Sequence, residues 1–402
     1  MANAEVSADD VVKNYADIAL AKYEDSLATA KTLDGAIEAF LVSPSAETHR
    51  AAKAAWIAAR VPYQQTEAYR FGNAIVDDWE GRVNAWPLDE GLIDYVDSSY
   101  GTESDENTLY TANLVANASI TINGDKVDAT KITPDFIQNL NEAGDIEANV
   151  TTGYHAIEFL LWGQDLNGTE QGAGERSHTD FDLSNCTNGN CERRADYLSA
   201  ASKLLISDLE EMVGNWTESG EARKAVMENP TNGISTILTG MGSLSYGELA
   251  GERMKLGLLL HDPEEEHDCF ADNTHNSHLY DAVGIRNVYL GSYKRIDGSS
   301  VSGPSLSQMV ASKDANLDSE LRGKLKETVG KMQKMADRAL TVEAYDQMIS
   351  EGNADGNATV QAAIDALVDQ TRSIERVVSL LDLGAIEFEG SDSLDNPNAV
   401  FE

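Results

Sequence analysis

A histidine and a glutamate three positions apart, His155 and Glu158, lie in an otherwise uncharged apolar segment. Residues 153–162 read GYHAIEFLLW. Because residues three apart share one face of a helix, the imidazole and the carboxylate can meet there. A carboxylate buried among large apolar side chains costs several kcal/mol unless a cation compensates its charge. The sequence therefore predicts either a metal ion or a buried arginine beside this pair.

The spacing of the pair is not specific by itself. An acidic residue also follows His261 three positions later, at Glu264, but Pro263 breaks the helix that would align those two side chains. The apolar surroundings, rather than the spacing, distinguish His155 and Glu158.

A second set of candidate residues lies upstream of the apolar segment. One face of a helix predicted over residues 44–72 carries four polar residues at steps of three and four, which are Arg60, Tyr63, Glu67 and Arg70. Glu67 and Tyr63 can supply oxygen ligands while the arginines hold carboxylates in place. A solvated helix face is the alternative interpretation of the same stripe.

A third set lies in residues 261–278, which contain four of the seven histidines. His275 and His278 have the spacing that lets two imidazoles reach one ion, and Asp272 and Asn273 stand beside them as ligands or orienting groups. A hydrated surface loop explains the same composition.

The residue types bear on the metal and on the chemistry. Mixed imidazole and carboxylate ligands suit iron, zinc, copper or manganese better than calcium or magnesium, which prefer oxygen. Arg253, in GELAGERM, is a candidate partner for a buried acid. Helical zinc peptidases use two histidines four residues apart, whereas Phe159 stands where the second would be. The conventional peptidase motif is therefore incomplete.

The net charge of the 402-residue chain is −38, from 30 basic and 68 acidic residues. Such a charge repels nucleic acid and anionic membranes and attracts cations, although solubility or salt adaptation of the surface is the simpler explanation of the charge by itself. No apolar run reaches the roughly 18 residues of a membrane span. Residues 1–10 contain no apolar signal core, and removal of an export signal upstream is left open.

The composition predicts an all-α protein with few or no short strands, because proline is scarce and Ala/Leu/Glu/Lys-rich windows are long. The length suggests two domains, at 1–190 with the His155 helix and at 191–402 as a second helical bundle. Predicted helices begin near residue 9 and cover 44–72 with a kink at Pro62, 134–143, 193–213, 233–260 and most of 305–383. We expect a hairpin near 118–130 and a polar connection with one short helix over 261–303.

The three cysteines indicate the compartment. Cys186 and Cys191 flank Thr-Asn-Gly-Asn, a strong turn sequence, so a disulfide between them is geometrically easy. A disulfide favours an oxidising compartment such as the periplasm or the cell surface. Two reduced surface thiols are the alternative, and Cys269 is expected to be a buried free thiol.

Residues 153–165, GYHAIEFLLWGQD, resemble the GxHxxE signature of the imelysin-like proteins. This family includes the bacterial iron-regulated protein A group and the insulin-cleaving membrane protease. Four other segments match in order, so the resemblance covers nearly the whole chain: RVPYQQTEAYRFG at 60–72, CERRADYL at 191–198, YGELAGERM at 246–254 and CFADNTHNSHLYDAVGIRNVYLG at 269–291.

The resemblance implies an exported, all-helical protein of the periplasm or outer cell surface, with two helical-bundle domains around a cleft. It implies metal ligands at that cleft, which are His155, Glu158, Glu67, Asp272 and His275. Around them we expect Arg60, Tyr63, Arg70, Gly153, Asn273 and Arg253. Ala271 stands where relatives often have serine, which argues against a hydroxyl function there.

The implied function is iron uptake, with a metal ion or iron chelate as ligand, a membrane transport protein as possible partner and no nucleic acid. Iron is the expected metal, with zinc or copper as alternatives. A metal-dependent peptidase with His155 and His275 on one ion is the second hypothesis. The third is a surface scaffold or glycan-binding module in which His155 and Glu158 pair with Arg60 or Arg253.

Overall fold

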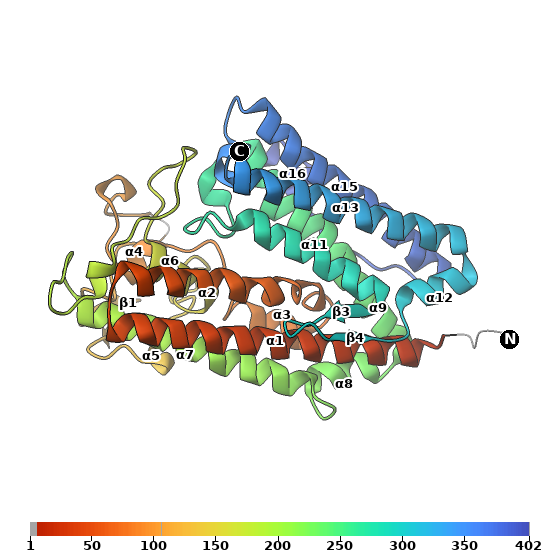
Figure 1. Cartoon of the computed structure of the whole chain (residues 1–402), viewed down its shortest axis with the longest axis horizontal. Coiled ribbons are helices and arrows are strands. Elements are labelled where there is room, and N and C mark those ends of the chain that lie inside the picture. Colours follow the sequence, from red (N-terminus) through yellow and green to blue (C-terminus); the bar gives the residue numbers. More distant parts are fainter. Residues whose placement is uncertain (1–5, 106, 402) are drawn as a thin grey trace.

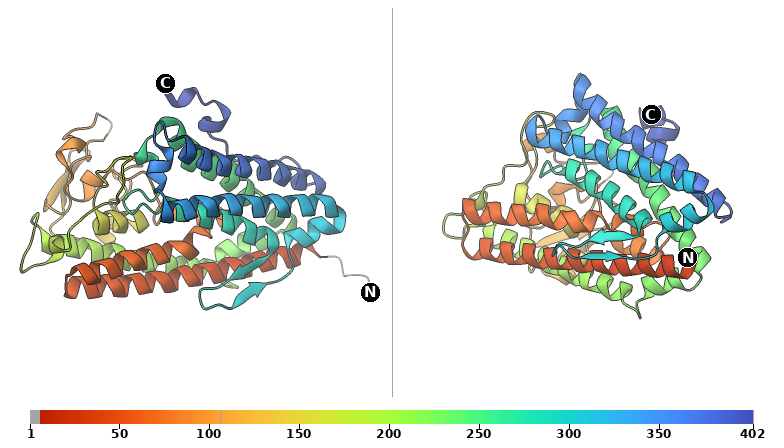
Figure 2. Two further views of the ribbon diagram at one scale, coloured as in Figure 1. Left: turned by 45° about the horizontal axis from the view of Figure 1, so that its top comes forward. Right: turned by 45° about the vertical axis from the view of Figure 1, so that its right-hand side comes forward.

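The computed structural model describes residues 6–105 and 107–401, and long helices lying side by side dominate it (Figure 1). The helices α7 (Cys191–Trp216), α1 (Ala8–Val42) and α2 (Ala46–Gln64) form one layer. The helix α11 (Thr274–Leu290) packs on α2, and α13 (Ala315–Thr341) and α15 (Ala354–Leu380) follow above it. Both views in Figure 2 show α13 and α15 along one side of the molecule and α1 along the other.

Shorter elements connect these helices. The remaining α-helices are α3 (Ala74–Glu80), α4 (Glu90–Ile93), α5 (Pro134–Gln138), α6 (Gly153–Trp162), α8 (Glu221–Met227), α9 (Pro230–Ser243), α10 (Leu256–Leu260), α12 (Leu306–Lys313), α14 (Tyr345–Ile349) and α16 (Asp392–Asp395). A π-helix, η4 (Leu244–Lys255), joins α9 to α10. The 3₁₀ turns are η1 (Glu67–Tyr69), η2 (Ser98–Tyr100), η3 (His178–Phe181), η5 (Pro263–Glu265) and η6 (Ala399–Phe401).

Two short antiparallel hairpins complete the described part of the chain. The first joins β1 (Ser119–Ile122) to β2 (Asp125–Asp128), where the sequence predicts it. The second joins β3 (Ser292–Lys294) to β4 (Ser300–Ser302) and was not predicted. The mostly helical fold class is confirmed.

Local sequence explains where the first two helices begin. The Ser7 hydroxyl accepts a hydrogen bond from the backbone N–H of Asp10 at the start of α1. Val12, Tyr15, Ala19 and Tyr23, at steps of three and four, form the buried stripe of this helix. Ser45 and Thr48 form a capping box at the start of α2. The predicted start at Ser43-Pro44 was therefore slightly early.

The second helix ends sooner than predicted. Pro62 lies inside α2, which stops at Gln64, and η1 follows as a separate turn. Proline has no N–H for the helical hydrogen bond and crowds the preceding turn, so the helix ends soon after it. Arg60 and Tyr63 therefore do not share one continuous helix face with Glu67 and Arg70.

The prediction for residues 261–303 was wrong, because α11 occupies 17 of these residues. Its buried residues include the polar His275, Ser277, His278 and Asp281, so no apolar stripe marks it as a helix. The predicted helix at 134–143 is shorter than expected, ending at Gln138. The predicted helix at 233–260 is helical throughout, although its middle is the π-helix η4.

The helix α7 packs along α1 and α6, so its neighbours come from the first half of the chain. The division into domains at residue 190 remains a prediction. Cys186 and Cys191, just before and at the start of α7, are joined by a disulfide, and Cys269 is free. No helix in the described part of the chain has the length and apolar character needed to cross a membrane.

Candidate metal centre

The helix α6 places His155 and Glu158 in the interior, and Gly153 sets its starting point. All ten residues of α6 are buried. Gly153 has a φ of 78°, and a Cβ added there would clash with the backbone oxygen of Val83. That oxygen accepts the Tyr154 N–H at 2.8 Å. The glycine of the GxHxxE segment is therefore required by its left-handed backbone conformation and by the close approach of the Val83 backbone.

We predict that Gly153→Ala lowers the free energy of unfolding by roughly 1–3 kcal/mol, because the side chain adds both left-handed strain and a clash with backbone. Chemical denaturation of wild type and variant measures the difference. Gly35→Ala on α1 is the matched control, since a Cβ there meets nothing within 4 Å and its φ is not in the left-handed region. Equal destabilisation by the two changes would contradict this explanation.

His155 and Glu158 contact each other directly. Nδ1 of His155 lies 2.9 Å from Oε2 of Glu158, and both side chains are almost completely buried. The other carboxylate oxygen of Glu158 accepts the backbone N–H of Ala271 at 2.9 Å. Nε2 of His155 has no hydrogen-bond partner among residues 6–105 and 107–401. Glu158 therefore contacts one nitrogen of the imidazole, whereas the second nitrogen has no hydrogen-bond partner in the described part of the chain.

The loop between η5 and α11 brings two further candidate ligand residues, His267 and Asp268, to this helix. One ligand atom each from His155, His267 and Asp268 lie within 4.8 Å of one another, and all three residues are buried. The two imidazole rings are 4.8 Å apart, centre to centre. Ligands bound about 2.1 Å from an ion lie roughly 3–4 Å from each other, so a small contraction would bring this set around one metal.

Asp268 is held by several donors from other elements. Nη2 of Arg60 lies 2.7 Å from Oδ1 of Asp268, and Nδ2 of Asn273 donates to Oδ2 at 2.8 Å. The hydroxyl of Ser277 also donates to Oδ2. Arg60 donates to Asn84 as well, at 2.6 Å. The buried arginine of this site is therefore paired with Asp268 rather than with Glu158.

Aromatic rings surround the Arg60 guanidinium. Its central carbon lies 5.0–5.6 Å from the ring centres of Trp56, Tyr63 and Tyr154. Such contacts stabilise a cation that is removed from water. The predicted supporting residues Arg60, Tyr63 and Asn273 thus all adjoin Asp268 or its partner.

The environment keeps both imidazoles neutral. Burial, with a further contribution from Arg60, lowers the pKa of His155 to about 3. Burial, assisted by the charge of Arg253, lowers the pKa of His267 well below its ordinary value. Neutral imidazoles keep the lone pairs that a metal requires. Both rings can therefore serve as ligands without first losing a proton at neutral pH.

The two carboxyl groups differ in charge state. Burial, and then the Asp268 charge, raise the pKa of Glu158 well above its ordinary value. Burial alone would also raise the pKa of Asp268, but Arg60 and His155 hold it at about 2. Asp268 is therefore the ionised carboxylate of the cluster, and its charge is balanced by Arg60.

Glu67 and the predicted Arg253 and Arg70 belong to an adjoining ionic cluster. Nη2 of Arg253 lies 2.7 Å from both Glu67 and Glu248, and its Nη1 lies 3.3 Å from Asp281. Arg70 lies 3.3 Å from Glu248. The carboxylate of Glu67 is thus already paired with a guanidinium and lies outside the His155 cluster.

Asp272 and His275 are also outside the three-residue cluster. Each has one buried polar atom without a partner in the described chain, Oδ1 of Asp272 and Nδ1 of His275. Burial raises the pKa of Asp272 to about 7 and lowers that of His275 to about 4. The sequence drew attention to the histidine-rich segment but not to its members His267 and Asp268. Their contact with α6 is a long-range one that no local pattern marks.

A cavity of about 430 Å³ reaches His267 from the adjoining ionic cluster. Its walls include Arg253, Glu248, Asn84 and Trp86. The ring of Trp86 meets that of His267 edge to face at 6.0 Å. One ligand residue of the buried cluster is therefore accessible from a cavity lined by charged groups.

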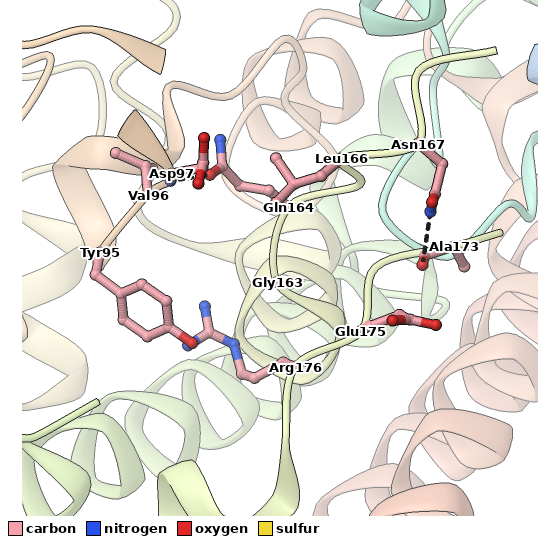
Figure 3. A pocket seen from close by; sticks show the side chains of 10 residues that line it. All are labelled: Tyr95, Val96, Asp97, Gly163, Gln164, Leu166, Asn167, Ala173, Glu175 and Arg176. Carbon is pink, nitrogen blue, oxygen red and sulfur yellow. Dashed lines mark hydrogen bonds between the residues drawn. The ribbon is translucent and has the colours of Figure 1, made fainter. Parts of the chain in front are cut away.

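A different pocket, of about 310 Å³, lies beyond the C-terminal end of α6 (Figure 3). Its walls carry Tyr95, Gln164, Leu166 and Arg176, and the Arg176 guanidinium faces the Tyr95 ring at 4.9 Å. Arg176 is already paired with Asp94 at 2.8 Å. The residues that line this pocket include neither His155 nor the other members of its cluster.

A comparison with known protein families assigns this mostly helical chain to one of them. The family model named Imelysin matches residues 19–374, and the chain belongs to the imelysin family. The relationship inferred from the five sequence segments is therefore confirmed.

Individual relatives agree with this assignment. The chain is 30% identical over 86 residues to iron-regulated protein A of Synechococcus elongatus, a match that spans 21% of this chain and 24% of that relative. A crystal structure described as an iron-regulated protein A precursor of Parabacteroides distasonis has a TM-score of 0.65 at 19% identity, over 94% of this chain and 97% of that one. An imelysin-like protein of Psychrobacter arcticum has a TM-score of 0.57 at 16% identity, over 95% and 98%. These two structures share the fold.

Proposed function

We propose that the protein binds iron for uptake and that His155, His267 and Asp268 supply the ligands. A cation bound at Nε2 of His155 would leave the ring proton on Nδ1 and favour the ionised form of Glu158, which would then accept that proton in a hydrogen bond and orient the ring, as carboxylates do beside metal-bound histidines. The observation that carries the proposal is the convergence of two neutral imidazoles and an ionised carboxylate in the interior, with Nε2 of His155 unpartnered in the described chain. Buried polar atoms are almost always satisfied, so an unpartnered one suggests a missing ligand.

The donor set favours a transition metal. Nitrogen and oxygen ligands together suit iron, zinc and copper, and the names of the relatives favour iron among them. The disulfide between Cys186 and Cys191 supports an oxidising location, for which we propose the periplasm or outer cell surface. A membrane transport protein that receives the metal is part of the same proposal.

Arg60 suits a site that releases its metal. In the absence of an ion, Arg60 neutralises Asp268, and an arriving cation must share that carboxylate with a guanidinium 2.7 Å away. The repulsion between the two positive charges limits the affinity. A moderate affinity is useful for cargo that must be passed on, whereas a permanent structural metal would have no need of such a competitor.

Calorimetric titration of the metal-free chain with Fe²⁺ under anaerobic conditions tests the site. We expect one ion per wild-type chain, loss of most of the affinity in His155→Ala, and a decrease of roughly 10–100-fold in Glu158→Gln, whose amide orients the ring less well. His178→Ala, in the η3 turn, is the matched control and should bind like wild type. Equal binding by wild type and His155→Ala would eliminate the proposed site.

The second candidate is a metal-dependent peptidase, since two imidazoles and a carboxylate are also the ligands of catalytic zinc sites. The oxygens of Glu158 are engaged by His155 and by the Ala271 N–H, so this carboxylate is not free to act as a base. Incubation with unfolded protein substrates, with and without chelator, separates the two functions. Chelator-sensitive cleavage that is lost in His155→Ala would establish the peptidase.

The scaffold or glycan-binding hypothesis predicts a different result from the same variants. In that case Glu158→Gln would lower the melting temperature of the protein without changing any metal affinity. The calorimetric comparison therefore also distinguishes a purely structural pair from a metal centre.

A further inference from the structure

The loop that carries His267 and Asp268 also lines a second, acidic cavity. Its walls contain five carboxyl groups, together with Cys269 and Phe270, and those five are Glu90, Asp165, Glu264, Glu266 and Asp346. They come from α4, the chain after α6, η5, the following loop and α14. The lining contains no lysine or arginine. Five acidic groups thus converge from separate segments without a basic residue in the wall.

Two of these carboxylates are buried without partners. Glu266 and Asp346 are each 1% exposed, and none of their four carboxylate oxygens has a hydrogen-bond partner in the part of the chain that the structure describes. The Thr274 hydroxyl lies near Glu266, and the backbone N–H groups of Asp346 and Gln347 lie near the Asp346 carboxylate, but none of them makes a hydrogen bond of good geometry with these oxygens. Buried carboxylates without donors are costly and rare in native proteins. The cavity therefore lacks a positive partner.

The size of the cavity limits what can enter it. Its volume is about 10 Å³, which is about the space of one water molecule. An organic cation would not fit beside the carboxylates, whereas a single metal ion would. The bound species is thus expected to be monatomic.

The donor atoms indicate the class of ion. The wall offers the oxygens of five carboxyl groups and a single sulfur, that of Cys269. Oxygen ligands from irregular segments suit calcium, which accepts six to eight oxygens in flexible geometry, better than magnesium, which demands a near-ideal octahedron.

We propose that Glu266 and Asp346 form the centre of a calcium site that joins α14 to the loop between η5 and α11. The site would be separate from the transition-metal cluster, because its ligands are oxygens and include neither His155 nor Asp268. An ion there would tie that loop, and with it His267 and Asp268, to the C-terminal helices. Burial, followed by the charge of Glu264, raises the pKa of Glu90 to about 7. Burial, followed by the charge of Asp272, raises the pKa of Asp346 to about 7 as well. Both shifts are consistent with carboxyl groups that lack a positive partner.

The test is a Ca²⁺ titration of the chelator-treated full chain, followed by calorimetry and by thermal denaturation. We expect wild type to bind one Ca²⁺ and to melt at a higher temperature when it is bound. Glu266→Gln and Asp346→Asn should each weaken Ca²⁺ binding roughly tenfold or more, because each removes a charged ligand. Glu375→Gln, an exposed position on α15, should bind Ca²⁺ like wild type.

Thermal denaturation without calcium provides a readout that does not depend on binding. Each isosteric amide removes a buried, uncompensated acid, so both variants should melt at or above the wild-type temperature when Ca²⁺ is absent and below it when Ca²⁺ is saturating. His155→Ala should retain full Ca²⁺ affinity, so failure of the transition-metal proposal leaves this one intact. Absence of Ca²⁺ binding by wild type, unchanged binding by both variants, or tighter binding of Mg²⁺ than of Ca²⁺ would overturn the proposal.

Discussion

Arg60→Met is expected to destabilise the metal-free protein by about 3–5 kcal/mol and to make its stability depend on added metal. The guanidinium is 1% exposed and is the positive partner of Asp268, so its removal leaves an ionised carboxylate in the interior. Methionine retains much of the aliphatic volume, which limits loss from packing. A divalent ion at the cluster would then replace the positive charge that Arg60 places 2.7 Å from Asp268.

Denaturation of wild type and Arg60→Met, with and without Zn²⁺ as a redox-stable substitute for Fe²⁺, measures the effect. The metal should stabilise the variant more than wild type, because no guanidinium competes with it for Asp268. Arg372→Met is the control, since that side chain is 71% exposed and forms only a loose pair with Asp369, at 3.9 Å. If Zn²⁺ stabilised the variant no more than wild type, Asp268 would not be a ligand.

Arg253→Met is expected to have a comparable or larger effect, about 5 kcal/mol. Arg253 is 3% exposed and pairs with Glu67, Glu248 and Asp281 at 2.7–3.3 Å. Its loss leaves three carboxylates near one another without their central cation. Because the net stability of a protein is commonly only 5–15 kcal/mol, part of the variant population should be unfolded at neutral pH.

The pH dependence identifies the cause of this loss. Burial already raises the pKa of Asp281 well above its ordinary value, although Arg253 opposes the shift. Without Arg253 the folded-state pKa rises further, so the folded variant retains protons that the unfolded chain releases. Stability from such a group is present at low pH and is lost as pH rises toward the folded pKa.

The stability difference between Arg253→Met and wild type should therefore be smaller at pH 5 than at pH 7.5, as measured by urea denaturation at both values. Arg376→Met is the control, because its side chain is 57% exposed and pairs with the partly exposed Glu320. A difference that does not change with pH would point to lost packing instead of unpaired charge.

The two arginine clusters indicate how an acidic protein can keep the proposed metal site in its interior. Arg60 and Arg253 each balance carboxylates beside the imidazoles, and their charges help to keep His155 neutral. Most of the net charge of −38 can then attract cations from outside without destabilising the site itself. The proposed calcium site differs because its cavity wall includes no arginine.

Several features could be predicted because they depend on residues close together in the chain. The apolar segment 153–162 forms a helix, and the three-residue spacing brings His155 and Glu158 within 2.9 Å. The Thr-Asn-Gly-Asn turn allows the disulfide between Cys186 and Cys191. The ordered family segments identified the imelysin relationship, which the family model confirms.

Other features were missed where burial has no periodic signature. The helix α11 buries polar residues such as His278 and Asp281 beside apolar ones, so its pattern is typical of a loop. The stripe from Arg60 to Arg70 was interpreted as one helix face, but α2 ends after Pro62 and Glu67 turns to Arg253. In both cases tertiary contacts outweighed the local pattern.

The sequence by itself determined the helical class, the family and the local pair of His155 and Glu158, since these follow from periodicity, motif and spacing. Only the tertiary structure brings together the residues of the candidate site. Asp268 meets Arg60 across 208 residues, and His267 reaches His155 from a loop with no regular pattern. Such contacts arise when distant segments are buried together and their charges must be balanced, a condition that no local stretch of sequence expresses.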